Sequence, residues 1–282
     1  MPNYLRPTAL EDALAALSSR RLTVLAGGTD FFPARVGAPL DDDVLDITAL
    51  QSMRAIDENA DHWRIPALAT WTDIVNADLP PWFAGLKLAA REIGGRQVQN
   101  AGTLCGNLCN ASPAADGVPV LLSLDAEVEL ASSAGSLTVP LAEFIRGNRE
   151  TALAPDQLMV AVRIPKPRAQ LEEVPARPLG ARRYLVISIV MVAAALEAGA
   201  DGRVTRASVA VGACSPVACR LPALEQALVG RRPCDAALGE VATDAHMVPL
   251  APVNDARGSA GYRLDAARTL TARTLAELGS MM

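Results

Sequence analysis

The pattern of apolar and polar positions near the N-terminus predicts a small β/α unit. The segment TALEDALAALSSR places Leu10, Leu14 and Leu17 at spacings of four and three, which is the spacing of one helix face. Thr8 and Glu11 have the spacing of a capping box, so we expect the helix to begin there. The stretch LTVLAGG predicts a buried strand that runs into a glycine turn, and DVLDIT predicts a second strand.

The middle of the chain, up to residue 165, mixes helix and strand patterns. PPWFAGLKLAAREIG is typical of a helix, and VPVLLSLD carries signals of both kinds. AEVELAS alternates as a half-buried strand does, and DQLMVAVRIPKP predicts the last strand of this region.

A stretch rich in proline and charge, residues 165–183, is the best candidate for a domain boundary. Beyond it, the apolar YLVISIVMVAAALEAG is followed by GRVTRASVAVGACS, which predicts a strand. LPALEQALVG predicts a short helix that a glycine stops, and TLTARTLAELGSMM predicts a closing amphipathic helix. We therefore expect a first domain over residues 1–170, with subdomains at about 1–55 and 56–170, and a second α+β domain over residues 176–282.

Composition narrows the class of protein. Half of the 282 residues are hydrophobic, which is enough for a sizeable core and for two domains. The formal net charge of −5 argues against nucleic acid as the main partner, because phosphate binding needs a basic face. The N-terminus lacks the basic and apolar regions of a signal peptide. The longest apolar run, Tyr184 to Leu196, has 13 residues and is too short to span a bilayer, so we expect a cytoplasmic protein without a membrane span.

The first candidate for ligand binding is LAGGTDFFP, residues 25–33, where a strand runs into two glycines. Gly27 and Gly28 can adopt positive φ and let the backbone approach a ligand closely. Successive N–H groups in such a turn form a concavity that binds anions, and Thr29 adds a hydroxyl donor. Two glycines after a strand are also common in ordinary turns, so this segment alone is a weak signal.

The second candidate is NAGTLCGN, residues 100–107, which again combines small residues with hydrogen-bond donors. Two separate glycine-rich loops suggest a pyrophosphate that is held from two sides. The carboxylate of Asp116 is suited to accept from a ribose or sugar-chain hydroxyl, although a helix N-cap explains this residue equally well. Neither segment matches the P-loop or the G-x-G-x-x-G signature.

The five cysteines and two histidines do not form a metal-binding pattern. Cys105 and Cys109 are spaced C-x3-C, whereas zinc and iron–sulfur sites use four ligands, commonly with C-x2-C pairs. Buried reduced thiols, and surface or structural roles for His62 and His246, are the simpler interpretation. No Ser/His/Asp or Cys/His constellation is visible, so hydrolase chemistry has little support, and we predict no metal site in this chain.

The two loops and the segments around them closely resemble the FAD-binding medium subunit of the molybdenum hydroxylases, the xanthine dehydrogenase and carbon monoxide dehydrogenase family. The resemblance covers nearly the whole chain through LAGGTDFFP, GGRQVQNAGTLCGNLCNASPAADGVPVLLSLDAEVEL, LMVAVRIPKP, RRYLVISIVMVAAAL and APVNDARGSAGYRLDAARTL. The paired loops are its most specific part. It implies an α+β fold, in which a two-subdomain FAD-binding region of the PCMH type is followed by a C-terminal domain with a small antiparallel sheet and helices.

The resemblance also implies which residues contact FAD. The two loops would hold the pyrophosphate, Asp116 matches the family's acidic contact, and Ile93 and Met159 match apolar contacts. Ile187 lies where the family places a side chain against the isoalloxazine ring. The implied cofactor-binding residues are Leu25, Ala26, Gly27, Gly28, Thr29, Asp30, Phe31, Ile93, Gly102, Thr103, Leu104, Cys105, Gly106, Asn107, Asp116, Met159 and Ile187.

Two positions depart from the family's pattern. Cys105 stands where the family usually has a glycine. If that position needs positive φ, the cysteine costs ~1 kcal/mol or more, and otherwise its side chain lies close to the cofactor. Some members place a lysine near the flavin, at a position close to Pro178 here, with Arg177, Arg182 and Arg183 as candidates for its role.

On this resemblance the chain is the FAD subunit of a heterotrimeric molybdenum hydroxylase, which assembles as a dimer of heterotrimers. An iron–sulfur small subunit would carry two [2Fe–2S] clusters, and a large subunit would carry the molybdenum cofactor. Electrons would pass from the clusters to the flavin and on to an external acceptor. This chain would hold the cofactor and would need no catalytic side chain of its own. Two other functions stay open on the sequence: a stand-alone flavin oxidase, and a non-catalytic assembly module that has lost FAD.

Overall fold

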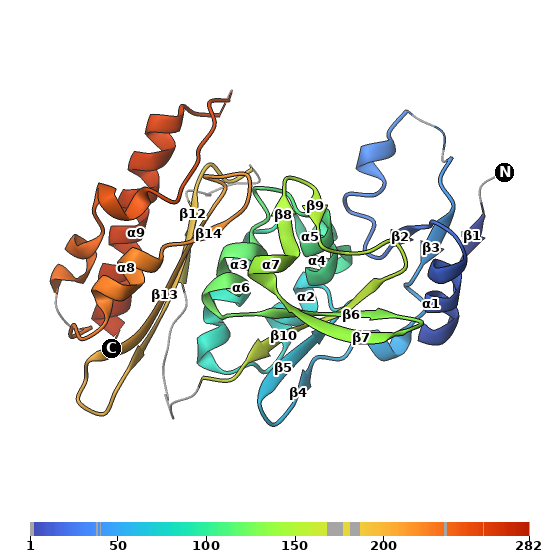
Figure 1. Cartoon of the computed structure of the whole chain (residues 1–282), viewed down its shortest axis with the longest axis horizontal. Helices are drawn as coiled ribbons and strands as arrows, with labels where there is room; N and C mark the ends of the chain where they lie inside the picture. Colours follow the sequence, from blue (N-terminus) through green and yellow to red (C-terminus); the bar gives the residue numbers. More distant parts are fainter. Residues whose placement is uncertain are drawn as a thin grey trace. The chain divides into compact units, whose positions relative to one another are not determined.

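The computed structural model describes residues 3–37, 39, 41–167, 177–180, 187–233, 236–255 and 257–281. The chain divides into two compact units, each assembled from segments that are distant in sequence (Figure 1). The first unit comprises residues 1–77, 94–111 and 126–165, and the second comprises residues 78–93, 112–125 and 166–282. Two short segments from the middle of the chain therefore pack with the C-terminal part. The domain boundaries expected from the sequence stay a prediction.

A three-stranded parallel sheet and one helix begin the first unit. In spatial order the strands are β1 (Tyr4–Leu5), β3 (Val44–Asp46) and β2 (Thr23–Leu25), and the helix is α1 (Leu10–Ser19). Leu14 and Leu17 are buried, as their spacing predicts. The predicted capping box at Thr8 is wrong, because the N-cap residue is Ala9, whose side chain makes no capping bond.

The larger sheet of the first unit is antiparallel. Its strands, in spatial order, are β4 (Asp57–Glu58), β5 (His62–Pro66), β10 (Leu158–Pro165), β6 (Glu127–Ser132) and β7 (Gly135–Pro140). Ile65, Val162 and Val128 are paired across the three central strands, and all three are fully buried. The alternation that predicted β6 therefore places its apolar side chains in the core.

Short elements connect these sheets. They are η1 (Pro33–Arg35), η2 (Gln51–Met53), α2 (Trp71–Asn76), α4 (Arg96–Ala101), α5 (Leu104–Asn110), α7 (Leu141–Phe144), β8 (Ile145–Gly147) and β9 (Glu150–Thr151). Helix α5 packs against β10. Helix α2 begins with a capping box between Thr70 and Asp73, in which Thr70 Oγ1 accepts from the Asp73 N–H at 3.1 Å. This cap fixes the turn that lies beside the second glycine loop.

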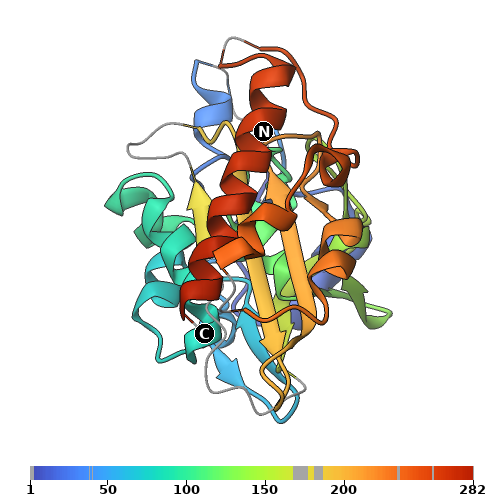
Figure 2. The same cartoon turned by 90° about the vertical axis from the view of Figure 1, so that its left-hand side faces the viewer.

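The second unit is built on an antiparallel sheet covered by a long helix. The strands are β11 (Arg177–Gly180), β12 (Met191–Ala198), β13 (Val204–Gly212) and β14 (Cys219–Arg220), and the helix is α9 (Ala260–Met281). Helix α9 runs across the sheet (Figure 2), and Val192, Val209 and Leu275 are fully buried. Each such buried side chain stabilises the fold by about 1.5–3 kcal/mol. The end of the longest apolar run is therefore a core strand.

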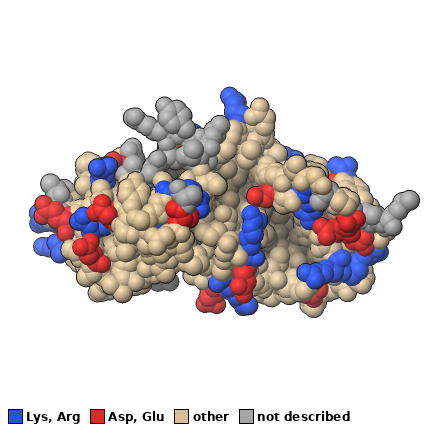
Figure 3. Space-filling view, turned by 90° about the horizontal axis from the view of Figure 1, so that it is seen from above, with Lys and Arg blue, Asp and Glu red and all other residues tan. Residues whose placement is uncertain are grey.

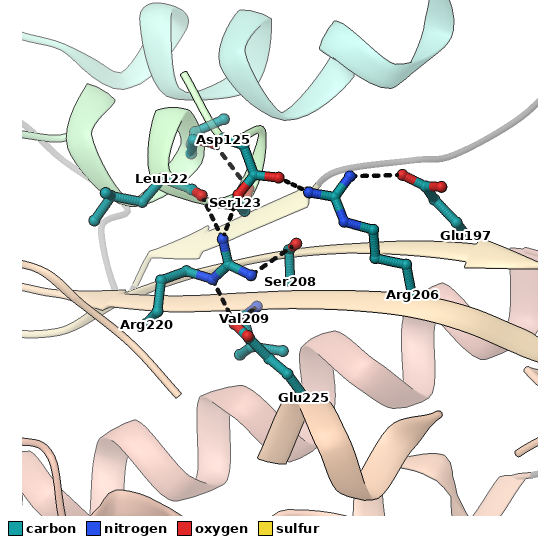
Figure 4. A network of polar contacts seen from close by, with 10 residues as sticks. Leu122, Ser123, Asp125, Glu197, Arg206, Ser208, Val209, Arg220 and Glu225 are labelled. Atoms are coloured by element: carbon teal, nitrogen blue, oxygen red, sulfur yellow. Dashed lines mark hydrogen bonds and ion pairs between the residues drawn. The ribbon is translucent and has the colours of Figure 1, made fainter. Parts of the chain in front are cut away.

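Helix α6 (Gly117–Ser123) joins this unit through close packing on β13. A Cβ added to Gly212 would lie 2.5 Å from Pro119 Cγ, so only glycine allows the helix to approach the strand this closely. Arg220 then reaches the far end of α6, where it donates to Leu122 O at 2.9 Å and to Asp125 Oδ1 at 2.7 Å (Figure 4). The remaining elements are η3 (Pro81–Phe83), α3 (Ala84–Glu92), α8 (Pro222–Leu228), η4 (Ala236–Val241) and η5 (Asp244–Met247).

The surface carries charges of both signs. On the face shown in Figure 3, Lys and Arg side chains lie among Asp and Glu side chains, without an extended area of one sign. A nucleic-acid partner would require a basic face, which this face does not offer. Among the residues that the structure describes, no helix has the combined length and apolarity needed to cross a bilayer.

A loop carboxylate, Asp255, anchors the start of α9. Its Oδ1 accepts from the Arg263 guanidinium at 2.7 Å, and its Oδ2 accepts from the Arg257 guanidinium at 2.8 Å. A hydrogen bond from the Arg257 backbone N–H, followed by that from Arg263, lowers the pKa of Asp255 from 3.8 to about 2.

We expect this carboxylate to make the stability of the protein sensitive to acid. Because the pKa of Asp255 is lower in the folded chain, its stabilising effect is complete above the unfolded pKa of 3.8 and is lost as the pH falls toward about 2. Over that range the melting temperature of the wild-type chain should fall more steeply than that of Asp255→Asn. Thermal unfolding followed by circular dichroism measures both slopes, and equal slopes would contradict this expectation.

Candidate flavin site

The first glycine loop is shaped by a close approach of two backbones. Strand β2 ends at Leu25, and a Cβ added to Gly27 would lie 2.0 Å from Ala101 O and 2.9 Å from Gly102 Cα. Gly28 has φ of +73°, and a Cβ there would lie 2.7 Å from the Phe32 ring. Glycine is therefore required at both positions, at the first by space and at the second by both φ and space.

The second loop is held by hydrogen bonds to its neighbours. Gly102 N–H donates to Val98 O at 2.7 Å, and Gly102 O accepts from the Trp71 N–H at 3.1 Å. A Cβ added to Gly102 would lie 3.2 Å from Thr29 Oγ1. The structure therefore brings the two predicted loops into contact, although they are far apart in sequence.

Helix α5 begins directly after this contact. Thr103 is its N-cap residue, and Thr103 Oγ1 accepts from the Gly106 N–H at 3.0 Å. Leu104 is fully buried and anchors the helix in the core. Asn107 lies one turn after Thr103, and its buried Oδ1 has no hydrogen-bond partner among the described residues. An unsatisfied buried oxygen is costly, which points to a missing donor at this position.

The rest of the first loop lies closer to solvent. Asp30 is exposed, and its backbone oxygen accepts from the Ala34 N–H at 3.1 Å. Phe31 is partly buried, and the Arg35 guanidinium lies 4.0 Å from the centre of its ring. Arg35 also donates to Phe31 O at 3.0 Å, so a cation–π contact and a hydrogen bond hold this end of the loop.

Cys105 lies in the first turn of α5 and is 3% exposed. Its backbone is helical, so the alternative in which this position requires positive φ does not apply. Burial raises the pKa of the Cys105 thiol well above its usual value, which keeps the thiol neutral. The side chain therefore acts as a small apolar core residue.

Replacement of Cys105 by glycine is expected to destabilise the chain and to leave its FAD affinity no higher. Glycine removes a buried side chain and adds backbone freedom inside a helix, and together these changes should cost about 1–2 kcal/mol. Urea unfolding and FAD titration would measure the two quantities, with Cys105→Ala as the variant that lacks the glycine effect. Tighter FAD binding by Cys105→Gly would show instead that the cysteine hinders the loop.

Cys109 and Met159 meet on the buried side of α5. Cys109 Sγ lies 3.9 Å from Met159 Sδ, and Met159 is 2% exposed on β10. Burial raises the pKa of Cys109 to about 12. In the described parts of the chain, no three His, Cys, Asp or Glu side chains come together as metal ligands would. His246 caps η5 by accepting from the Thr243 N–H at 3.2 Å, which is a structural role.

The other predicted contacts belong to the second unit. Ile93 follows α3 and is partly buried, whereas Ile187 precedes β12 and is 58% exposed. Asp116 is the N-cap residue of α6, but its side chain makes no capping bond. Instead Asp116 Oδ1 accepts from Ser188 Oγ at 2.9 Å. The sequence did not indicate Ser188, and its only signal was a hydroxyl within an apolar run.

The basic residues considered near the flavin fall largely outside the described structure. Arg182 and Arg183 are not among the described residues. The backbone of β11, which contains Arg177 and Pro178, pairs with β12. A role for an arginine of this segment beside the flavin therefore stays a prediction.

Comparison with known proteins finds a matching family for each half of the chain. Residues 1–167 match the family described as FAD binding domain in molybdopterin dehydrogenase, and residues 179–278 match the CO dehydrogenase flavoprotein C-terminal domain. The chain is 30% identical to the nicotine 6-hydroxylase medium subunit of Paenarthrobacter nicotinovorans, over 98% of this chain and 97% of that protein. It is 33% identical to the nicotinate dehydrogenase FAD-subunit of Eubacterium barkeri, over 80% and 79%.

Solved structures share the fold. A carbon monoxide dehydrogenase chain from Hydrogenophaga pseudoflava superposes with a TM-score of 0.85 at 26% identity, over 96% of this chain and 95% of that chain. The reconstituted CO dehydrogenase from Oligotropha carboxidovorans gives a TM-score of 0.89 at 24% identity, over 100% and 99%. At 24% identity, this second match shows that the fold is shared and nothing about function.

The fold and the matched domains define a flavoprotein that serves as one subunit of an oxidoreductase. The α+β architecture predicted from the sequence, with an FAD-binding region followed by a C-terminal domain, is confirmed. The chain belongs to the family of FAD-binding medium subunits of the molybdenum hydroxylases.

The residues of the first unit fit this cofactor. FAD carries a pyrophosphate and many hydroxyl groups, and it therefore needs close backbone approach and side chains that accept hydrogen bonds. Gly27 and Gly102 supply backbones that a Cβ would block, and Asn107 supplies a buried oxygen that no described residue hydrogen-bonds. When bound, the flavin supplies the redox chemistry, and the chain's own task is to hold and orient it.

Proposed function

We propose that this chain is the FAD-carrying electron-transfer subunit of a heterotrimeric molybdenum hydroxylase. It accepts electrons from the [2Fe–2S] clusters of a small subunit and passes them to an external acceptor. The contact of Gly27 with Ala101 and Gly102 carries the proposal, because it joins two glycine loops in a protein of the FAD-binding family. The predicted absence of a catalytic side chain in this chain agrees with such a role.

Each group of predicted contacts has a separate task in this proposal. The loops at 25–31 and 102–107 hold the pyrophosphate with backbone N–H groups and with Thr29. Asp116 accepts from a cofactor hydroxyl. Ile93, Met159 and Ile187 provide apolar contacts, with Ile187 against the isoalloxazine ring.

The substrate is assigned to another subunit. The relatives are named for nicotine, nicotinate and carbon monoxide, which differ widely in chemistry, although their flavin-binding chains are similar. We therefore propose a large subunit that carries the molybdenum cofactor and oxidises the substrate, and a dimer of heterotrimers as the complete enzyme. We place this enzyme in the cytoplasm.

The visible spectrum of the isolated full-length chain tests FAD binding. We expect flavin absorption with one FAD per chain, released by acid precipitation because the cofactor is not covalently attached. A chain that takes up no added FAD would support the assembly-module alternative, and a flavin that stays attached in acid would support the stand-alone oxidase.

Electron transfer requires a second test, on the chain co-expressed with its partner subunits. Anaerobic addition of substrate should bleach the flavin band only when the iron–sulfur subunit is present. Reduction of the flavin by substrate without that subunit would overturn the proposed electron path.

A further inference from the structure

A buried hydrogen bond links two of the segments of the second unit that carry predicted FAD contacts, those of Asp116 and Ile187. Ser188, directly after Ile187, donates from Oγ to Asp116 Oδ1 at 2.9 Å. Ser188 and Asp116 are 5% and 7% exposed, whereas Ile187 is 58% exposed. Two consecutive residues therefore face in different directions. Ile187 exposes its apolar side chain to solvent, and Ser188 binds the buried Asp116 carboxylate.

A buried arginine binds the backbone directly after Ser188. Arg263 on α9 is 2% exposed, and its Nη1 donates to Ile189 O at 2.7 Å and to Ala213 O at 2.9 Å. The Ala213 N–H in turn donates to Pro113 O at 3.0 Å, in the segment that leads into α6. Arg263 thus ties the carbonyl of Ile189, the residue after Ser188, to the segment that precedes α6.

The Ser188 hydroxyl also affects the orientation of the Asp116 carboxylate. A carboxylate in a buried position must be hydrogen-bonded, and each of its oxygens can accept more than one bond. The hydrogen bond from Ser188 restricts the plane of the Asp116 carboxylate, because hydrogen bonds are directional. Ile187 directly precedes Ser188, so a shift of the backbone at Ser188 also moves Ile187.

We infer that Ser188 is a positioning residue that orients the Asp116 carboxylate toward a cofactor hydroxyl and couples this contact to Ile187. The inference rests on the proposed role of Asp116 as an FAD contact. It predicts that the effects of Ser188 and Asp116 on cofactor binding depend on each other, which a purely structural role of Ser188 does not require.

A double-mutant cycle on the full chain tests this dependence, with FAD affinity measured by quenching of flavin fluorescence. Ser188→Ala should weaken FAD binding about five- to tenfold, the loss expected for one typical intramolecular hydrogen bond. In an Asp116→Ala background the same substitution should cause no further loss, since no carboxylate remains to be oriented. Equal losses in both backgrounds would overturn the inference.

A buried serine elsewhere in the unit provides the matched control. Ser215 is 8% exposed and accepts from the Ala251 N–H at 2.9 Å, so Ser215→Ala should lower the melting temperature without weakening FAD binding. The absorption spectrum of bound flavin should shift in Ser188→Ala, through Ile187, and stay unchanged in Ser215→Ala. A spectrum unchanged in both variants would contradict the coupling to Ile187.

The outcomes separate the inference from the proposed function. If Asp116→Ala binds FAD with wild-type affinity, the role of Asp116 as a contact fails and the inference fails with it. If Asp116→Ala is weakened and Ser188→Ala is not, only the positioning role fails. Should Ser188→Ala not fold, Ser188→Cys keeps a similar volume with a weaker donor, and it should show a smaller loss of the same dependence.

Discussion

Replacement of Gly27 by alanine is expected to weaken FAD binding at least tenfold by separating the two glycine loops. The new Cβ would lie 2.0 Å from Ala101 O and 2.9 Å from Gly102 Cα, and both neighbours are backbone atoms that cannot rotate away. Relief of the first contact requires a backbone shift of about 1 Å, which we expect to cost ~3 kcal/mol of stability. The same shift should weaken FAD binding tenfold or more, equivalent to about 1.4 kcal/mol.

A second glycine near the same loops provides the control. Gly95 has an extended backbone, and a Cβ there would lie 3.4 Å from Gln97 Oε1, at the end of a flexible side chain. Gly95→Ala should therefore change stability by less than about 1 kcal/mol and leave the FAD affinity unchanged. FAD titration and urea unfolding of both variants measure the difference. Wild-type affinity in Gly27→Ala would show that the contact between the loops is not needed for the cofactor.

The elements with regular apolar spacing could be predicted from the sequence. The alternation in AEVELAS places Val128 and Leu130 in the core, and the run in LPALEQALVG places Leu224 and Leu228 there, because strand and helix periods are local properties. The two glycine loops were also recognisable, since each combines glycine and threonine near a predicted strand or helix.

Contacts between distant segments could not be predicted in this way. A local period shows which side of a helix is apolar, but it does not show what covers that side. Nothing in residues 112–125 indicates that α6 packs on Gly212, or that Asp116 accepts from Ser188. Cys105 shows the same limit, because its helical backbone depends on the start of α5 at Leu104, within a segment that resembled a loop.

Replacement of Arg220 by alanine is expected to detach the end of α6 from the C-terminal sheet. Arg220 donates to Leu122 O, Asp125 Oδ1 and Ser208 Oγ, and it pairs with Glu225 (Figure 4). Its removal leaves Glu225, with a side chain only 15% exposed, without its cationic partner. Because the Arg220 side chain is 24% exposed, we expect a loss of about 2–4 kcal/mol, below the upper end for a fully buried pair.

The geometry of Arg220 also separates the effect of charge from that of shape. Arg220→Lys keeps the charge but cannot reach four acceptors at once, so it should lose about half as much stability as the alanine variant. Arg268→Ala, whose partners Asp244 and Asp265 are 94% and 68% exposed, should lose less than about 0.5 kcal/mol. The urea concentration at the midpoint of unfolding measures the stability of the three variants, Arg220→Ala, Arg220→Lys and Arg268→Ala. Since Asp116 begins the helix that Arg220 holds at its other end, Arg220→Ala should also weaken FAD binding. Equal stability losses in Arg220→Ala and Arg268→Ala would show that the network adds nothing beyond a surface ion pair.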